Sequence, residues 1–91
     1  MFKVYANKGF QMTFENGWTV SVMFGSGNYC SRRYNTSIEM PKNEYQSHKS
    51  KDAEITAWDI NNNWFEFEDD EVKGYVSTNE LSDFIQMIKN K

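Results

Sequence analysis

The chain has 91 residues and a formal net charge of −3, and 16% of its residues are aromatic. This length corresponds to one domain with a small core, and no apolar run approaches the roughly 18 residues that span a membrane. The single cysteine excludes an intramolecular disulfide, and the acidic balance disfavours a duplex-DNA binder, whose affinity depends on neutralising phosphates. Because no signal peptide is recognisable either, we expect a cytoplasmic protein without membrane contact.

The first predicted element in chain order is a β-hairpin centred on Asn16-Gly17. Apolar residues alternate with polar ones on both sides of this pair, as expected for half-buried strands: Phe10, Met12 and Phe14 before it, and Trp18, Val20, Val22 and Phe24 after it. A two-residue turn would place Phe14 across from Thr19 and mix the two faces. A three-residue turn pairs Phe14 with Trp18, so we predict Gly17 as a bulge residue in the left-handed conformation.

Residues 53–69 predict a second hairpin. Its turn is Asn61-Asn62-Asn63, because asparagine tolerates left-handed backbone geometry. With this turn, one face carries Ile55, Ala57, Phe65 and Phe67. The other face carries Trp58, Ile60 and Trp64, which need cover from the long loop, the N-terminus or a second subunit. We therefore predict Trp58, Ile60 and Trp64 as the interface of a homo-oligomer.

The C-terminal part predicts a short strand over residues 72–76 and then a helix. Ser77 and Glu80 have the spacing of a capping box, and the stripe of an amphipathic helix follows at Leu81, Phe84, Ile85 and Ile88. Residues 1–7 are a further candidate strand. The predicted fold class is α+β: an antiparallel sheet of two hairpins plus a short strand, packed by one C-terminal helix. We expect a single domain over residues 1–91 with a long central loop at 25–52.

Residues 25–33, Gly-Ser-Gly-Asn-Tyr-Cys-Ser-Arg-Arg, contain the strongest candidate site. Backbone amides around glycines form anion-binding concavities, a tyrosine ring can stack on a base, and arginines can bracket phosphate oxygens. The predicted ligand-binding residues are Gly25, Gly27, Asn28, Tyr29, Arg32 and Arg33. The spacing matches neither a Walker motif nor a dinucleotide fingerprint, so a solvated hairpin exit remains the alternative.

The charges are segregated along the chain. Residues 31–51 contain five basic residues against two acidic ones, whereas residues 52–80 contain nine acidic residues against Lys73 alone. A basic loop can hold a small anion even in an acidic protein. The acidic run at 66–71 fits a solvated edge or a protein-contact patch.

Two further patterns are candidates for a catalytic or a metal site. Cys30 and His48 are a candidate nucleophile and base, but no third orienting residue accompanies them, so a buried apolar cysteine is the simpler interpretation. Residues 59–63, Asp-Ile-Asn-Asn-Asn, begin like a calcium loop, yet Trp64 stands where that loop requires glycine. We therefore expect a turn there, and a protein that is not an enzyme and has neither a metal site nor a cofactor.

Four short stretches form a further pattern: residues 16–30 (NGWTVSVMFGSGNYC), residues 57–59 (AWD), residues 64–67 (WFEF) and the pair Gly74-Tyr75. Together they resemble small uncharacterised phage-encoded proteins over most of the chain. Small phage proteins often counter host defence, and some are oligomeric sponges that sequester nucleotide immune signals between subunits. The resemblance implies a counter-defence role in the host cytoplasm and carries over no functional residue.

The leading expectation is thus a non-enzymatic, homo-oligomeric binding protein that sequesters a small anionic nucleotide-like ligand. The alternative is an inhibitor of a host defence component that binds protein through its acidic face or aromatic patch. A small hydrolase is the third hypothesis. Whether Tyr29, Arg32 and Arg33 converge on a pocket or splay into solvent distinguishes the first hypothesis from the others.

Overall fold

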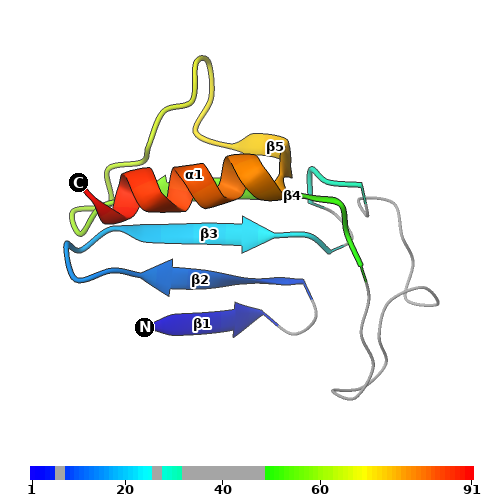
Figure 1. The fold of residues 1–91 in the computed structure, drawn as a ribbon. Helices are drawn as coiled ribbons and strands as arrows, with labels where there is room; N and C mark the ends of the chain where they lie inside the picture. The colour runs from blue at the N-terminus through cyan, green and yellow to red at the C-terminus, as the bar shows by residue number, and fades with distance from the viewer. Residues whose placement is uncertain (6–7, 26–27, 32–48) are drawn as a thin grey trace.

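The computed structural model describes residues 1–5, 8–25, 28–31 and 49–91. These residues form a five-stranded antiparallel sheet followed by one C-terminal helix that packs against it (Figure 1). The strands are β1 (Phe2–Tyr5), β2 (Gly9–Thr13), β3 (Thr19–Met23), β4 (Asp52–Trp58) and β5 (Lys73–Ser77), and the helix is α1 (Thr78–Lys89). Each strand pairs with the next one in sequence, so the sheet is a meander. The predicted α+β class is confirmed, and the candidate N-terminal strand is β1.

The β2–β3 hairpin has the predicted register. Met12 pairs with Val20 and Phe10 with Val22. The Gly17 amide donates to the Phe14 carbonyl at 3.0 Å, and Gly17 has a φ of 88°. The three-residue turn and the left-handed glycine are therefore confirmed, because matching the apolar faces of the two strands left one turn length.

The predicted second hairpin is shorter than expected. Trp64 forms an isolated bridge with Trp58, and the Phe65 amide donates to the Ala57 carbonyl at 2.9 Å, after which the pairing ends. The first half of the same β4 edge pairs with β5 instead. Two segments therefore share one edge of β4, and the acidic residues 66–71 lie in the connection between them.

The core lies between the sheet and one side of α1. Buried residues of β3, β4 and β5 meet two buried residues of the helix: Val20, Val22, Ala53, Ile55, Ala57 and Val76 from the sheet, and Phe84 and Ile88 from α1. The helix begins as its capping box predicts, since the Ser77 side chain accepts a hydrogen bond from the Glu80 amide at 3.2 Å. No helix in the described ranges is long and apolar enough to cross a bilayer.

The helix C-terminus is held by the turn of the first hairpin. The Asn16 side-chain amide donates to the Ile88 carbonyl at 2.8 Å and to the Lys89 carbonyl at 3.2 Å. The Lys91 ammonium lies over the Trp18 ring, 5.2 Å from its centroid. These contacts join the β2–β3 turn to the C-terminal end of α1.

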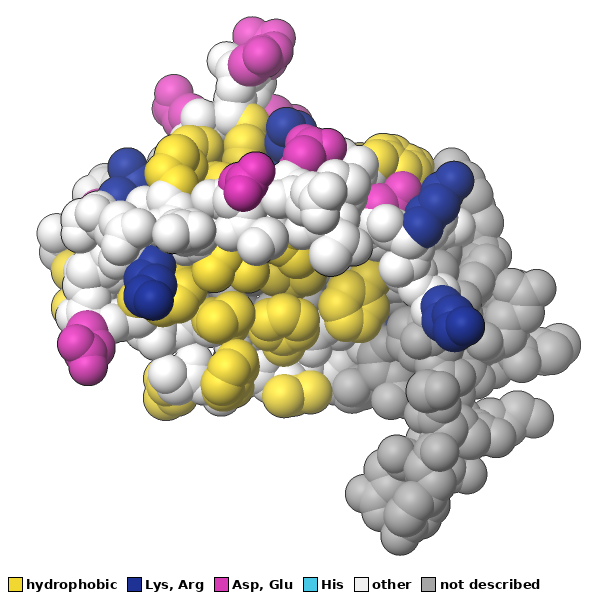
Figure 2. Space-filling model, viewed as in Figure 1, with side chains coloured by type: hydrophobic (Ala, Val, Ile, Leu, Met, Phe, Trp, Pro, Cys, Tyr) yellow, Lys and Arg dark blue, Asp and Glu magenta, His cyan; other side chains and the backbone are white. Residues whose placement is uncertain are grey.

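One helix covers only part of one sheet face. Apolar side chains lie uncovered on the helix side of the sheet (Figure 2), and Phe2 and Val4 of β1 are 69% and 70% exposed. The opposite face is more polar. It carries the Thr13 and Thr19 hydroxyls 2.9 Å apart, together with the contacting rings of Trp58 and Trp64.

Candidate functional site

The predicted ligand loop begins directly after β3. Gly25 is buried, and its carbonyl accepts hydrogen bonds from the Asn28 amide at 3.3 Å and from the Cys30 thiol at 3.7 Å. The predicted ligand residues Gly27, Arg32 and Arg33 lie outside the described residues. Of the six positions, the structure therefore places three: Gly25, Asn28 and Tyr29.

Tyr29 is clamped through its backbone. Its amide donates to the Glu54 carboxylate of β4 at 2.7 Å, and its carbonyl accepts from the Tyr75 amide of β5 at 2.8 Å. Gly74 makes this approach possible, because a Cβ atom there would lie 2.6 Å from the Tyr29 Cβ. Tyr75 has a φ of 55° at the bulge where the β4–β5 register shifts. The Tyr29 side chain is 47% exposed, so its backbone is fixed while its ring still meets solvent.

Ser31 is attached to the start of β4. Its amide donates to the Asp52 carboxylate at 2.5 Å, and its hydroxyl lies 3.1 Å from the Ser50 hydroxyl. Ser50 in turn donates to the Asp52 carbonyl at 2.7 Å. Hydrogen bonds to Glu54 and Asp52 thus attach the loop to β4 at two points.

These contacts change the interpretation of the loop amides. The sequence suggested that amides of residues 25–33 would face a ligand anion, but the Tyr29 and Ser31 amides each bind a carboxylate of the protein itself. Asp52 and Glu54 take the place that the sequence assigned to an external anion. A ligand anion near this loop therefore needs other positive groups.

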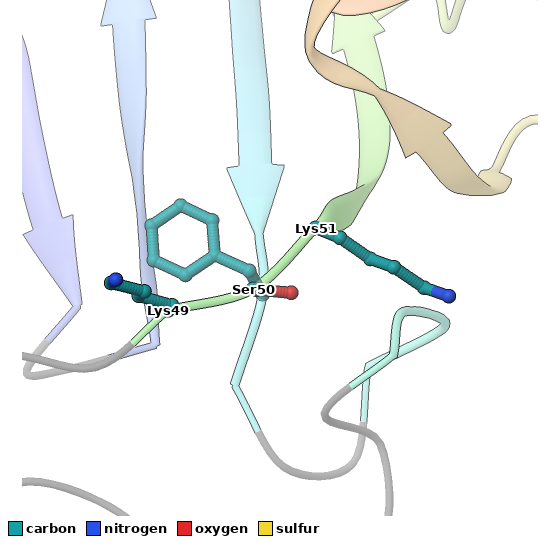
Figure 3. A pocket seen from close by; sticks show the side chains of 4 residues that line it. Lys49, Ser50 and Lys51 are labelled. Atoms are coloured by element: carbon teal, nitrogen blue, oxygen red, sulfur yellow. The ribbon is translucent and has the colours of Figure 1, made fainter.

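Such groups line a pocket beside the loop. The pocket has a volume of about 530 Å³ and is lined by Phe24, Lys49, Ser50 and Lys51. Figure 3 shows that Lys49 and Lys51 extend in opposite directions from the segment that leads into β4. The Phe24 amide donates to the Lys8 carbonyl at 2.7 Å, and its ring lies 6.3 Å from the Phe10 ring between centroids. Contacts with Lys8 and Phe10 therefore hold Phe24 in place at the wall of the pocket.

None of the four described residues that line this pocket was expected from the sequence to bind a ligand. The signals were partial: Lys49 and Lys51 belong to the basic segment, and Phe24 ends the alternating run of β3. Nothing in the local sequence indicates that Phe24 and Lys51 lie together, because a long connection separates them.

Cys30 is 1% exposed, and its thiol donates to the Gly25 carbonyl. This placement supports the interpretation as a buried, apolar cysteine. The candidate base His48 lies outside the described residues, so the pairing of the two side chains stays untested.

Residues 59–63 form the predicted turn. The Asp59 carboxylate accepts hydrogen bonds from the Asn61 and Asn63 amides, each at 2.9 Å, and Asn62 has a φ of 63°. The hydrogen bonds from Asn63 lower the pKa of Asp59, because they stabilise the ionised carboxylate. In this segment the resemblance to a calcium loop is explained by turn chemistry.

The predicted interface residues belong to the end of β4 and the segment that follows it. The Trp58 and Trp64 rings are tilted against each other with centroids 5.0 Å apart, and Trp64 is 44% exposed. Ile60 is 77% exposed, and its side chain lies against Gly17. We call Trp58, Ile60 and Trp64 the tryptophan patch.

Comparison with known proteins found no matching protein-family model, no matching curated protein and no matching solved structure.

Proposed function

We propose that this protein is a non-enzymatic binding protein that sequesters a small anionic, nucleotide-like ligand. The observation that carries the proposal is the pocket at the end of β3, which Lys49 and Lys51 line together with Phe24. Its volume of about 530 Å³ falls within the range of small-molecule sites, about 300–1,000 Å³.

The chemistry of the pocket fits such a ligand. Lysine ammonium groups bind phosphate as point charges, and aromatic rings supply a stacking surface for a base. The partly exposed ring of Tyr29 lies in the adjacent loop and offers a second surface. The proposal keeps Tyr29 from the sequence-based site and adds Lys49, Lys51 and Phe24 to it. The sequestering role is proposed from the resemblance to small phage-encoded proteins.

A thermal-shift screen of mono-, di- and cyclic nucleotides tests this function. A bound ligand stabilises the folded state by about 2.7 kcal/mol at one hundred times its dissociation constant. The double variant Lys49→Ala/Lys51→Ala should lose the shift. The double variant Lys3→Ala/Lys89→Ala removes the same charge away from the pocket and should keep it.

Recovery of the ligand after heat denaturation separates binding from turnover. An unchanged ligand supports sequestration, whereas a cleaved ligand moves the hydrolase hypothesis to the front. If no nucleotide gives a lysine-dependent shift, the proposal fails.

The second candidate function is inhibition of a host protein through the tryptophan patch or the acidic face. The partly exposed Trp64 and the largely exposed Ile60 favour it, because contiguous exposed apolar residues mark protein interfaces.

A further inference from the structure

A groove separates α1 from the segment that precedes β5. Its volume is about 360 Å³, and apolar side chains make up most of its lining: Ile55, Phe65, Phe67, Val76, Phe84 and Met87. Figure 2 shows apolar side chains along the side of α1 that faces the acidic connection. Among the described residues, the groove shares no lining residue with the pocket of Phe24, Lys49, Ser50 and Lys51, which we call the lysine pocket.

Three aromatic rings make the groove wall rigid. Phe65 and Phe84 meet edge to face at 5.1 Å between centroids, and Phe65 and Phe67 do the same at 5.0 Å. The Phe67 and Phe84 rings lie 5.3 Å apart. Met87 is 44% exposed at the rim, where its flexible thioether can adapt to an apolar partner. The groove wall therefore combines three packed aromatic rings with one flexible methionine side chain.

The surroundings of the groove are strongly acidic. Residues 66–83 contain seven carboxylates against one lysine: Glu66, Glu68, Asp69, Asp70, Glu71, Glu80 and Asp83 against Lys73. The Lys73 ammonium is itself paired with Glu80 at 3.1 Å. Figure 2 shows carboxylates both on the connection and along α1, with the apolar surface between them.

This charge distribution determines which occupant fits. A nucleic acid or a fatty-acid anion would be repelled by the carboxylates on both sides. The carboxylates of the described residues do not gather into a cluster that could hold a metal ion. A partner with several separate positive charges around an apolar strip meets both requirements.

We propose that this groove, which we call the acidic groove, binds a basic amphipathic segment of another protein. The apolar side chains of that segment enter between Phe65, Phe84 and Met87, while its lysines and arginines face the carboxylates of the connection and of α1. The inference rests on the second candidate function, to which it assigns a surface and a class of partner. It does not depend on the lysine pocket.

The length of the groove is consistent with a helical partner. The α1 residues that line the groove run from Glu80 to Met87, a rise of about 10 Å, which is room for apolar anchors at i, i+3 or i+4, and i+7 on a partner helix. Asp83 and Met87 are one helical turn apart on the rim, so one supplies charge and the other apolar contact along the same line.

Fluorescence anisotropy with a labelled peptide tests the proposal. The probe is a peptide of about 15 residues with leucine and phenylalanine on one helical face and lysine and arginine elsewhere. A second peptide has the same composition in scrambled order, and a third replaces every basic residue with glutamate. We expect saturable binding of the first peptide and at least about tenfold weaker binding of the other two.

Two variants locate the site. Asp83→Lys and Met87→Lys should each weaken binding about tenfold. Glu15→Lys makes the same charge change as Asp83→Lys but lies at the first turn, and Gln86→Lys is the helical neighbour of Met87 outside the groove lining. Both controls should stay within about twofold of the parent protein, and circular dichroism checks that every variant is folded.

Four results would overturn the inference. They are equal binding of the scrambled peptide, no saturable binding of any peptide, binding that is unaffected by Met87→Lys, and self-association that Met87→Lys abolishes. The last result would make a second copy of this chain the occupant. Because the nucleotide screen depends on Lys49 and Lys51, failure of either proposal leaves the other one standing.

Discussion

At the scale of single residues, Asn16 and Gly17 connect the first hairpin to the end of the helix. Gly17 supplies the left-handed turn residue, and the Asn16 side-chain oxygen accepts a hydrogen bond from the Trp18 amide at 3.0 Å. The Asn16 side-chain nitrogen meanwhile donates to carbonyls at the C-terminus of α1. One amide group therefore serves a turn and a helix end that are far apart in the chain, because its oxygen accepts while its nitrogen donates.

We expect Asn16→Asp to destabilise the fold by about 2 kcal/mol, and by more than Asn16→Ala. The carboxylate cannot donate to the Ile88 carbonyl, and it places negative charge at the negative end of the helix dipole. Chemical denaturation with circular dichroism measures the effect. Asn79→Asp makes the same change in the first turn of α1, where it should be neutral or slightly stabilising. Equal effects at both positions would contradict this electrostatic explanation.

Tyr29 and Gly74 illustrate another residue-scale point. The glycine has no side chain to obstruct Tyr29, so the loop backbone reaches the edge of β5. The sequence contains both residues but gives no sign that they meet.

At the scale of elements, the turn at residues 59–63 is organised by one carboxylate. The Asp59 carboxylate accepts two backbone hydrogen bonds and one from the Asn63 side chain at 3.1 Å. Its pKa lies below the ordinary value of 3.8, chiefly because of the hydrogen bonds from Asn63. The ionised form is thus the one that the folded turn prefers.

The lowered pKa gives a pH dependence with a definite sign. The folded protein binds the Asp59 proton less readily than the unfolded chain, so the stabilisation is present above pH 3.8 and is lost as the pH falls through the lower pKa of the folded state. Asp59→Asn should therefore flatten the decline of the unfolding free energy below about pH 4. Thermal melts between about pH 2 and 7 measure this, with Asp69→Asn as the charge-matched control. If the unfolding free energy of the parent protein and that of Asp59→Asn declined identically at acidic pH, the role given to Asp59 would be contradicted.

At the scale of the whole molecule, one helix leaves apolar residues exposed at the edge strand β1 and at the tryptophan patch, in addition to the acidic groove. On the helix side, Phe2 and Val4 of β1 extend beyond the cover of α1, and near the β2–β3 turn lies the tryptophan patch. A layer that buries one part of one sheet face cannot protect the rest. These exposed apolar residues therefore lie at separate places on the described part of the molecule.

We predict that the chain self-associates through the tryptophan patch. Light scattering at high micromolar concentration should show an oligomer that Ile60→Ser/Trp64→Ser converts to a monomer, because the variant removes the two most exposed members of the patch. Phe2→Ser/Val4→Ser changes the other exposed surface and should leave the oligomer intact. A monomeric parent protein would remove this prediction, and an oligomer sensitive only to the β1 variant would move the interface to the helix side.

Much of the fold was predictable because its signals are local. Strand alternation, the glycine at position 17, the capping box at Ser77 and the stripe of α1 each depend on residues a few positions apart. The short second hairpin was less predictable. Residues 64–65 and β5 both pair along one edge of β4, and the sequence does not say how two segments divide an edge.

The sequence by itself thus determined the class of fold, the first hairpin, the capped helix and the separation of acidic from basic segments, since period and charge are read along the chain. Only the tertiary structure decided that the carboxylates of Asp52 and Glu54 accept hydrogen bonds from amides of the loop. It also decided that Lys49 and Lys51 line the same pocket as Phe24, and that the acidic groove lies beside α1. These contacts join segments that are distant in sequence, and a local pattern does not specify which distant groups meet.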